Sequence, residues 1–232
     1  MSRILMVVSA ADTLVLADST THPTGFWAEE VAATHETLTA AAGVRVDIAT
    51  PGGARPTVDA LSLSEQGGVS PADAERFRTY LAGIDGQLSH PLVLGEIDPA
   101  AYDAVIIPGG HAPMTDLVGD RDLAALLAAA DAAARPVAAL CHGVVGLLSA
   151  ETPDGWLFAG RRMTGFSDAE EVQGGYGDAI PYSVEQRMRA GGGLVEVGAP
   201  WSDTVVADGT LITGQNPQSS VSTATALLEQ LD

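Results

Sequence analysis

An apolar run at residues 136–140 stops abruptly at Cys141-His142-Gly143, and a second apolar segment follows at residues 144–148. This pattern predicts a strand, a sharp elbow and a helix. At such an elbow the cysteine side chain is lifted above the sheet edge, and the helix directs its unpaired N–H groups at the sulfur. We therefore expect Cys141 to be a thiolate near neutral pH, the alternative being an ordinary buried thiol.

Further apolar runs at residues 4–8, 44–49 and 102–111 predict strands, the first of them buried on both faces of a sheet. Helical patterns occupy residues 24–42 and 120–134. Strand, helix and strand joined by short connections are typical of a parallel α/β sheet. The predicted fold class is therefore α/β.

The rest of the chain predicts a single domain of 232 residues with one insertion. Residues 51–99 form a long irregular stretch with a helix start at Ser70-Pro71, and we expect them to be an insertion, or lid, over the strand ends. A hairpin turn is predicted at Asp208-Gly209. Short strands and a last helix are expected at residues 161–165, 194–197, 204–207, 210–213 and 218–231.

The charge balance excludes several classes of partner. Eleven basic residues against 30 acidic ones give a formal charge of -19. Nucleic acid and anionic membranes are therefore unsuitable partners, and no apolar stretch approaches the roughly 20 residues that a membrane span needs. A single cysteine permits no internal disulfide, and the N-terminus shows no secretory signal pattern. We expect a cytoplasmic protein; the sequence leaves a homodimer open.

Four segments are expected to meet at the carboxyl ends of the strands, where open parallel sheets build their sites. They are residues 12–30, Gly109-Gly110-His111, Cys141-His142 and residues 165–171. A thiolate that attacks a carbonyl creates an oxyanion, and losing one of its N–H donors costs roughly 3 to 4 kcal/mol. Gly110 and His142 are suited to donate those N–H groups; the alternative for the glycine pair is a plain tight turn.

Carboxylates near these segments suggest acid–base chemistry. Asp168 or Glu171 is available to orient the ring of His142, which would otherwise be an ordinary polar residue. Of the adjacent Glu29 and Glu30, one must lie near the buried side of the helix, where desolvation raises its pKa and suits it to carry protons. The histidines and the cysteine show no metal-ligand spacing, so we expect neither a metal nor a cofactor.

Five motifs together resemble the ThiJ/PfpI superfamily, in their order and approximate spacing, over nearly the whole chain. The segment Thr24-Gly25-Phe-Trp-Ala-Glu-Glu30 is most similar to that of the heat-shock-chaperone-like glyoxalase III branch. The motifs are Ile-Pro-Gly-Gly-His111, Ala-Leu-Cys141-His142-Gly143, Thr164-Gly-Phe-Ser-Asp168-Ala-Glu-Glu171, Ala199-Pro-Trp201-Ser-Asp and Thr213-Gly-Gln-Asn216-Pro217.

The resemblance implies a fold and a set of roles. The fold would be a flavodoxin-like, class I glutamine amidotransferase-like parallel-sheet sandwich with a nucleophile elbow. Cys141 would be the nucleophile with His142 beside it, Glu30 would hydrogen-bond the sulfur, Glu171 would orient the histidine, and Gly110 and His142 would donate N–H groups to the oxyanion. Additional substrate-binding positions are expected at Gly109, His111, Trp27 and Asp168.

These observations lead to an enzyme as the first hypothesis. It would be a metal-free, glutathione-independent glyoxalase III, a lyase of the D-lactate dehydratase type that converts the small aldehyde methylglyoxal to lactate. The spacing supports thiol chemistry on a carbonyl, whereas the particular aldehyde comes from the resemblance. The alternatives are a stress-response chaperone or oxidant sensor with the same reactive cysteine, and a specialised hydratase or lyase on the same scaffold.

Overall fold

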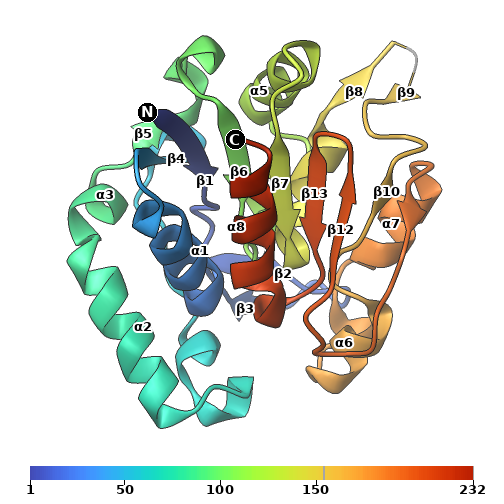
Figure 1. The fold of residues 1–232 in the computed structure, drawn as a ribbon. Coiled ribbons are helices and arrows are strands. Elements are labelled where there is room, and N and C mark those ends of the chain that lie inside the picture. The colour runs from blue at the N-terminus through green and yellow to red at the C-terminus, as the bar shows by residue number, and fades with distance from the viewer. Residues whose placement is uncertain (154, 232) are drawn as a thin grey trace.

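A seven-stranded sheet with the order β12-β13-β7-β6-β1-β4-β5 forms the centre of the molecule (Figure 1). The computed structural model describes residues 1–153 and 155–231. The strands of the sheet are β1 Ser2–Val7, β4 Val44–Thr50, β5 Leu92–Val93, β6 Ala104–Ile107, β7 Val137–Leu140, β12 Val205–Asp208 and β13 Leu211–Gly214.

Six strands of this sheet run parallel, and only the edge strand β12 runs antiparallel to its neighbour β13. The turn between β12 and β13 lies at the predicted position, where Gly209 takes a φ of 55°. The prediction of an α/β fold with a parallel sheet is confirmed. Because the strands are parallel, their carboxyl ends lie at one edge and bring together loops that are far apart in the sequence.

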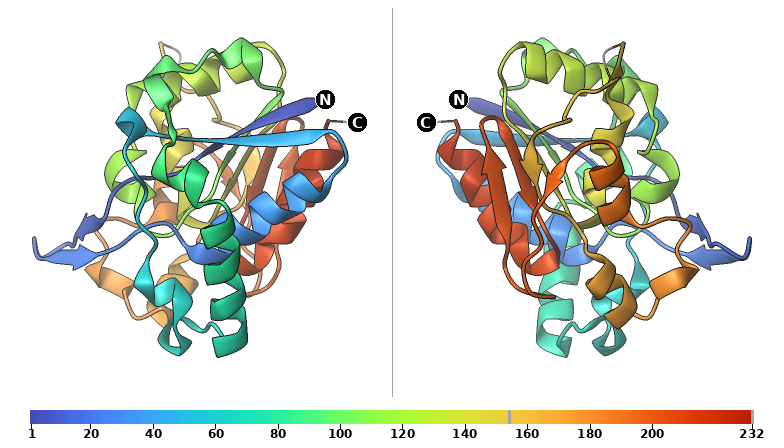
Figure 2. Two further views of the ribbon diagram at one scale, coloured as in Figure 1. Left: turned by 90° about the vertical axis from the view of Figure 1, so that its left-hand side faces the viewer. Right: turned by 90° about the vertical axis from the view of Figure 1, so that its right-hand side faces the viewer.

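Helices cover both faces of the sheet, as the two side views show (Figure 2). Side chains alternate between the faces of a strand, so β1 contributes to two cores. Ile4 and Met6 belong to a buried cluster that includes residues of α1, α2 and α8, whereas Leu5 and Val7 belong to a second cluster that includes residues of α5 and α7. The helices are α1 Ala28–Ala40, α2 Pro71–Gly83, α3 Asp85–Ser89, α4 Pro113–Asp116, α5 Arg121–Ala132, α6 Asp168–Gln173, α7 Val184–Ala190 and α8 Ser220–Glu229.

Short elements complete the described chain. The small strands pair as β2 with β3, β8 with β9 and β10 with β11. Their bounds are β2 Thr13–Val15, β3 Thr21–Pro23, β8 Glu151–Thr152, β9 Gly155–Trp156, β10 Arg162–Met163 and β11 Leu194–Val195. The 3-10 helices are η1 Pro51–Gly53, η2 Ala60–Leu63, η3 Glu65–Gly67, η4 Leu94–Glu96, η5 Pro99–Ala101, η6 Cys141–Ser149, η7 Gly177–Ala179 and η8 Pro217–Ser219.

Two predicted helices differ from the observed ones. The helix expected at residues 24–42 begins only at Ala28, because Phe26 forms a bridge with Val58 and keeps the preceding backbone extended. The helix expected after the elbow is a 3-10 helix, η6. Trp27 lies at the N-cap position of α1, and its side chain makes no capping hydrogen bond.

The stretch at residues 51–99 contributes more than an insertion. Its strand β5 pairs with β4 and forms one edge of the central sheet, which the sequence pattern did not predict. The helix start at Ser70 is as predicted, since the Ser70 side chain accepts the N–H of Asp73. The helix α2 packs against α1.

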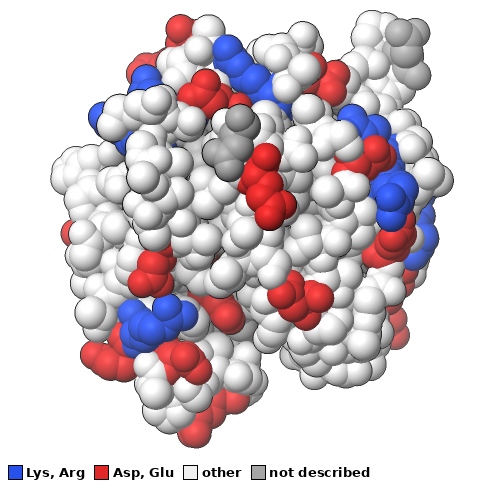
Figure 3. Space-filling view, viewed as in Figure 1, with Lys and Arg blue, Asp and Glu red and all other residues white. Residues whose placement is uncertain are grey.

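The surface agrees with the acidic composition. Acidic side chains are spread over the face in Figure 3, and arginines lie beside them rather than in a basic cluster. Arg76, for example, pairs with Glu36. No helix in the described part of the chain is long and apolar enough to cross a bilayer.

Candidate active site

Cys141 lies at the carboxyl end of β7 in a strained backbone conformation. Its φ is 56°, in the left-handed region that non-glycine residues rarely adopt, and only 3% of the residue is exposed. The neighbouring backbone of β6 approaches so closely that a Cβ at Gly109 would lie 2.6 Å from the Gly143 nitrogen. The tight turn therefore directs the sulfur to a fixed position at the strand ends.

Two backbone N–H groups, those of Gly110 and His142, lie beside the Cys141 sulfur and lower its pKa. Gly110 has a φ of 84°, and a Cβ there would lie 2.5 Å from the Gly25 oxygen and 2.7 Å from the Trp27 nitrogen. Glycine is therefore required at this position for both its conformation and its close approach. These are the two N–H groups that the sequence analysis predicted as donors to the oxyanion.

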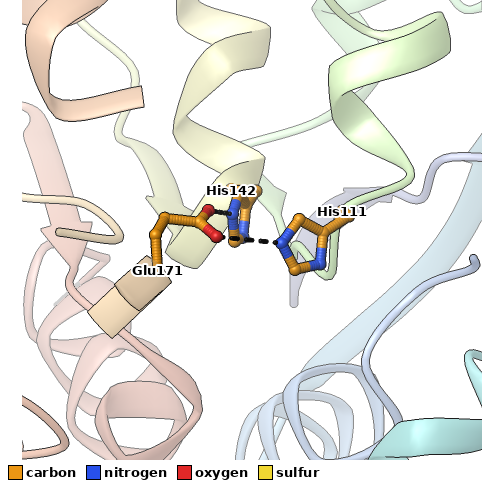
Figure 4. A group of neighbouring side chains, drawn as sticks. All are labelled: His111, His142 and Glu171. Atoms are coloured by element: carbon orange, nitrogen blue, oxygen red, sulfur yellow. Dashed lines mark hydrogen bonds and ion pairs between the residues drawn. The ribbon is translucent and has the colours of Figure 1, made fainter. Parts of the chain in front are cut away.

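His142 lies between the sulfur and a carboxylate. Its Nδ1 is 3.3 Å from Cys141 Sγ, and its Nε2 hydrogen-bonds Glu171 Oε1 (Figure 4). The second carboxylate oxygen is 3.4 Å from His111 Nε2. Because a carboxylate only accepts, Glu171 keeps the proton on Nε2 of a neutral His142 and leaves Nδ1 free to accept the thiol proton.

The electrostatics agree with this arrangement. Burial, with the nearby His111, lowers the pKa of His142 to about 4. Burial alone would raise the pKa of Glu171, but the charge of His142 and the hydrogen bonds from His111 and His142 hold it well below its usual range. At neutral pH the pair is therefore a neutral imidazole beside a carboxylate.

Glu30, from α1, is fully buried. Its Oε2 accepts the Gly109 N–H at 2.7 Å, its Oε1 has no hydrogen-bond partner among the described residues, and the Cys141 thiol lies close enough to affect its pKa. Burial raises the pKa of Glu30 to about 8. Glu30 therefore holds its proton at neutral pH and is a proton carrier next to the sulfur.

The expectation that Cys141 rests as a thiolate is wrong. Burial first, and then the charge and hydrogen bond of Glu30, raise the pKa of Cys141 well above its ordinary value. The N–H groups of Gly110 and His142 lower it, as expected from the elbow, but burial outweighs them. The sulfur must consequently give up its proton to a neighbour when it attacks.

A cavity of about 610 Å³ opens over Cys141. A series of rings in tilted or edge-on contact lines part of the cavity. Their centroid separations are 4.5 Å from Tyr176 to His111, 4.0 Å from His111 to His142, 4.4 Å from His142 to Phe166 and 5.6 Å from Phe166 to Trp201. Sequence reasoning assigned no role to Tyr176, Phe166 or Trp201. The last two lie in the motifs after Thr164 and Ala199, which could have indicated them.

Further lining residues come from the start of α1, including its N-cap, and from the stretch at residues 51–99. Trp27, Leu61 and Phe77 are among their apolar members, and Glu29 also lines the cavity. Glu29 is partly exposed, and burial raises its pKa to about 7. Of the two adjacent glutamates, Glu30 thus faces the sulfur and Glu29 the wider cavity.

Two of the predicted substrate-binding residues, Gly109 and Asp168, do not line the cavity. The N–H of Gly109 donates to Glu30 instead. The carboxylate of Asp168 accepts hydrogen bonds from the Ser183 hydroxyl and, at 2.7 Å, from the Gln186 amide. Its side chain is used to join α6 to α7, so the proposed substrate-binding role falls to other residues.

A group of three side chains offers atoms that could hold a metal ion. The ligand atoms of His111, His142 and Glu171 lie within 4.8 Å of one another. Both carboxylate oxygens already face an imidazole Nε2, so a metal would have to replace these hydrogen bonds. The expectation of a metal-free site stays a prediction.

The geometry at Gly110 yields a first test. We expect Gly110→Ala to lower the melting temperature and the turnover strongly, because its Cβ would collide with backbone atoms and displace an N–H donor. Gly43→Ala is the matched control, since Gly43 has a similar φ of 80° and nothing within 4 Å of the added Cβ. Only the left-handed strain, about 1 to 2 kcal/mol, should remain there. Equal losses in thermal unfolding would contradict the close packing of Gly110.

A parallel α/β sheet with a strained cysteine elbow, an adjacent histidine–glutamate pair and a buried second glutamate defines a class of cysteine-centred α/β proteins. The DJ-1/PfpI family matches residues 22–230, and the chain belongs to this family. The expected resemblance to the ThiJ/PfpI superfamily and its glyoxalase III branch is thereby confirmed.

Individual relatives carry two kinds of name. "Glutamine amidotransferase-like class 1 domain-containing protein 1" of Bos taurus is 32% identical over 82% of this chain and 81% of its own length. "Glyoxalase 3" of Candida albicans is 30% identical over 66% of this chain and 67% of its own length. The crystal structure of the Candida albicans glyoxalase III has a TM-score of 0.84 over 99% and 97% of the two chains, at 24% identity, which shows a common fold.

A further solved structure, Rapid Encystment Protein 24 kDa of Francisella tularensis, has a TM-score of 0.89 at 25% identity and covers 100% of both chains. The whole fold, including the stretch at residues 51–99, is therefore shared with that protein.

Proposed function

We propose that this protein is a cysteine-dependent, glutathione-independent glyoxalase III-type enzyme that converts methylglyoxal or related 2-oxoaldehydes to 2-hydroxy acids. The observation that carries the proposal is the environment of Cys141 Sγ. It meets two N–H donors, the free Nδ1 of His142 at 3.3 Å and the protonated Glu30 under an open cavity. The glyoxalase names of relatives support the choice of substrate.

The reaction would begin with attack on the aldehyde carbon. A bond forms between Cys141 Sγ and C1, the thiol proton passes to His142 Nδ1, and Glu171 stabilises the imidazolium. The N–H groups of Gly110 and His142 stabilise the oxyanion. The proton then moves from Nδ1 to this oxygen and gives a hemithioacetal, so that His142 is neutral again.

An internal redox step follows. His142 takes the proton from C1 to give an enediolate, and the C1 hydroxyl passes its proton to the C2 oxygen. Glu30 then supplies a proton to C2, which leaves a thioester at C1 and a hydroxyl at C2. The proton on His142 restores Glu30. Water then attacks the thioester, the C–S bond breaks, and the 2-hydroxy acid and the Cys141 thiol are released. The sum is addition of one water molecule.

The composition supports a cysteine as the nucleophile toward the carbonyl. All 11 basic residues are arginines, so the sequence has no lysine that could form a Schiff base with an aldehyde. The cavity volume lies within the range of roughly 300 to 1,000 Å³ typical of small-molecule sites, so 2-oxoaldehydes larger than methylglyoxal would fit. We propose the cytoplasm as the compartment.

The direct test is incubation with methylglyoxal in the absence of glutathione, with aldehyde loss and lactate formation followed together. We expect both at equal rates, unchanged by EDTA and lowered by added Zn²⁺, which would occupy the nitrogens of His111 and His142. Aldehyde loss without lactate would indicate simple adduct formation and would favour the sensor or chaperone. Loss of activity in EDTA that Zn²⁺ restored would contradict the metal-free mechanism.

A further inference from the structure

We propose that Glu170 is a positioning residue for the Cys141 site: its buried carboxylate joins three loops and thereby fixes Glu171 against His142 and Trp201 at the cavity wall. The activity assays below rest on the proposed function. The three loops carry the motifs around Ser167, Trp201 and Asn216, which the reaction itself does not use.

Both carboxylate oxygens of Glu170 accept hydrogen bonds. The residue is fully buried. Its Oε2 accepts the N–H of Ser167 at 3.0 Å and the Ser167 hydroxyl at 2.7 Å. Its Oε1 accepts the Trp201 N–H at 2.8 Å, the Gln215 amide at 3.1 Å and the Asn216 amide at 2.8 Å. Five neutral donors therefore stabilise a carboxylate that has no cationic partner among the described residues.

Each donor comes from a segment that is fixed in turn. Gln215 Oε1 accepts the Gly198 N–H at 2.7 Å, and the Asn216 amide also donates to the Ser202 oxygen at 2.8 Å. Trp201 has a φ of 62°, which is strained for a tryptophan and persists only where its surroundings hold it. The bond from its N–H to Glu170 is one of the contacts that hold this conformation.

Glu170 connects these loops to the residues around Cys141. Glu171 is the next residue of α6, and consecutive side chains on a helix point about 100° apart. Glu170 can therefore face the loops while Glu171 faces His142 and His111. On the other side, Trp201 packs edge-on to Phe166, whose ring lies 4.4 Å from that of His142. Movement of this carboxylate would disturb both neighbours of the histidine.

The negative charge of Glu170 also acts on His142, where it favours the protonated ring and raises its pKa against the larger lowering by burial. Loss of this charge alone would therefore lower the pKa of His142 in Glu170→Gln. In a variant that keeps the charge of Glu170, a changed His142 titration reports a displaced Glu171.

The principal variant is Glu170→Gln. Glutamine keeps the shape of the side chain, but it removes the negative charge and points an NH₂ group at some of the donors that bind the carboxylate. We expect kcat for methylglyoxal to fall about 10- to 100-fold with KM changed less, since a small misplacement of a catalytic pair has this cost. The pKa of His142, measured by NMR on the free protein, should fall further below that of the wild type.

Two further variants keep the test decisive. Ser167→Ala removes one of the five donors, is expected to fold, and should lower kcat a few-fold in the same direction. Asp47→Asn is the control, because Asp47 is a comparably buried carboxylate bound to Arg3, Arg45 and Tyr102 and does not line the cavity. It should lower the melting temperature without a change in kcat.

The outcomes separate the two proposals. Wild-type kcat and an unchanged His142 titration in Glu170→Gln and Ser167→Ala, with only a lower melting temperature, would overturn the positioning role. If the wild-type protein converts no 2-oxoaldehyde, the proposed function fails, and the His142 titration in Ser167→Ala, which keeps the charge of Glu170, still decides the positioning role.

Discussion

Replacing Cys141 with serine should reduce 2-oxoaldehyde turnover by roughly 10⁴-fold or more, because the whole reaction proceeds through a bond to this sulfur. A serine hydroxyl ionises far less readily than a thiol and is a weaker nucleophile. Sγ is 3.3 Å from the acceptor Nδ1 of His142, and the smaller oxygen would also lie in a site shaped for sulfur. The fold should persist, since serine is nearly isosteric and must adopt the same φ of 56°.

The measurement is kcat/KM from lactate formation, with thermal unfolding of the same preparations. Cys141→Ala is the companion variant, because it removes the nucleophile without adding a hydroxyl and should show the same loss. A serine variant that kept a tenth of the activity would mean that Cys141 is not the nucleophile. A large fall in melting temperature would instead point to damage at the elbow.

Much of the fold could be predicted because its signals are local. The apolar runs after Asp103 and before Cys141 were long enough to identify strands. Strands covered on both faces are apolar throughout, so no alternation of polar and apolar residues was needed to recognise them. The edge strand β5 was missed because it is only Leu92–Val93 and lies inside an irregular stretch. Its identity depends on pairing with β4, which no local pattern encodes.

The site was predicted in part. The order of the motifs brought Cys141, His142, Glu171 and Gly110 to one edge of the sheet, and the structure places them together. Asp168 was misplaced because its carboxylate is bound by Ser183 and Gln186, and these contacts between segments more than a dozen residues apart follow no local pattern. A capping-box pattern, Ser167-x-x-Glu170, was a signal for Glu170 that could have been used.

The pKa of Cys141 could not be predicted from the elbow alone. The N–H groups act in the expected direction, but burial depends on how the walls close over the sulfur, and the opposing charge of Glu30 comes from a helix more than a hundred residues earlier in the chain. Long-range packing therefore decides the protonation state, whereas local sequence decides only the position of the sulfur.

Replacing Glu30 with glutamine is expected to lower kcat by about 10²- to 10⁴-fold, because the amide cannot exchange the proton that C2 requires. Glutamine Oε1 can still accept the Gly109 N–H, which Glu30 Oε2 accepts at 2.7 Å, so the fold should be retained. Glu36→Gln is the control on the same helix, since Glu36 is exposed and does not line the cavity. Full activity in Glu30→Gln would show that the proton comes from another group.

The pH dependence of the same variant tests the protonation state. Wild-type activity should fall as pH rises through about 8, where Glu30 loses its proton, and this limb should be absent from the residual activity of Glu30→Gln. The raised pKa of Glu30 also determines how the stability of the fold changes with pH. Deprotonation is costlier in the folded than in the unfolded chain, so Glu30 destabilises the wild type progressively between pH 4.5 and about 8. The melting temperature of the glutamine variant should therefore rise relative to the wild type over this interval, and a constant difference would contradict a buried, protonated Glu30.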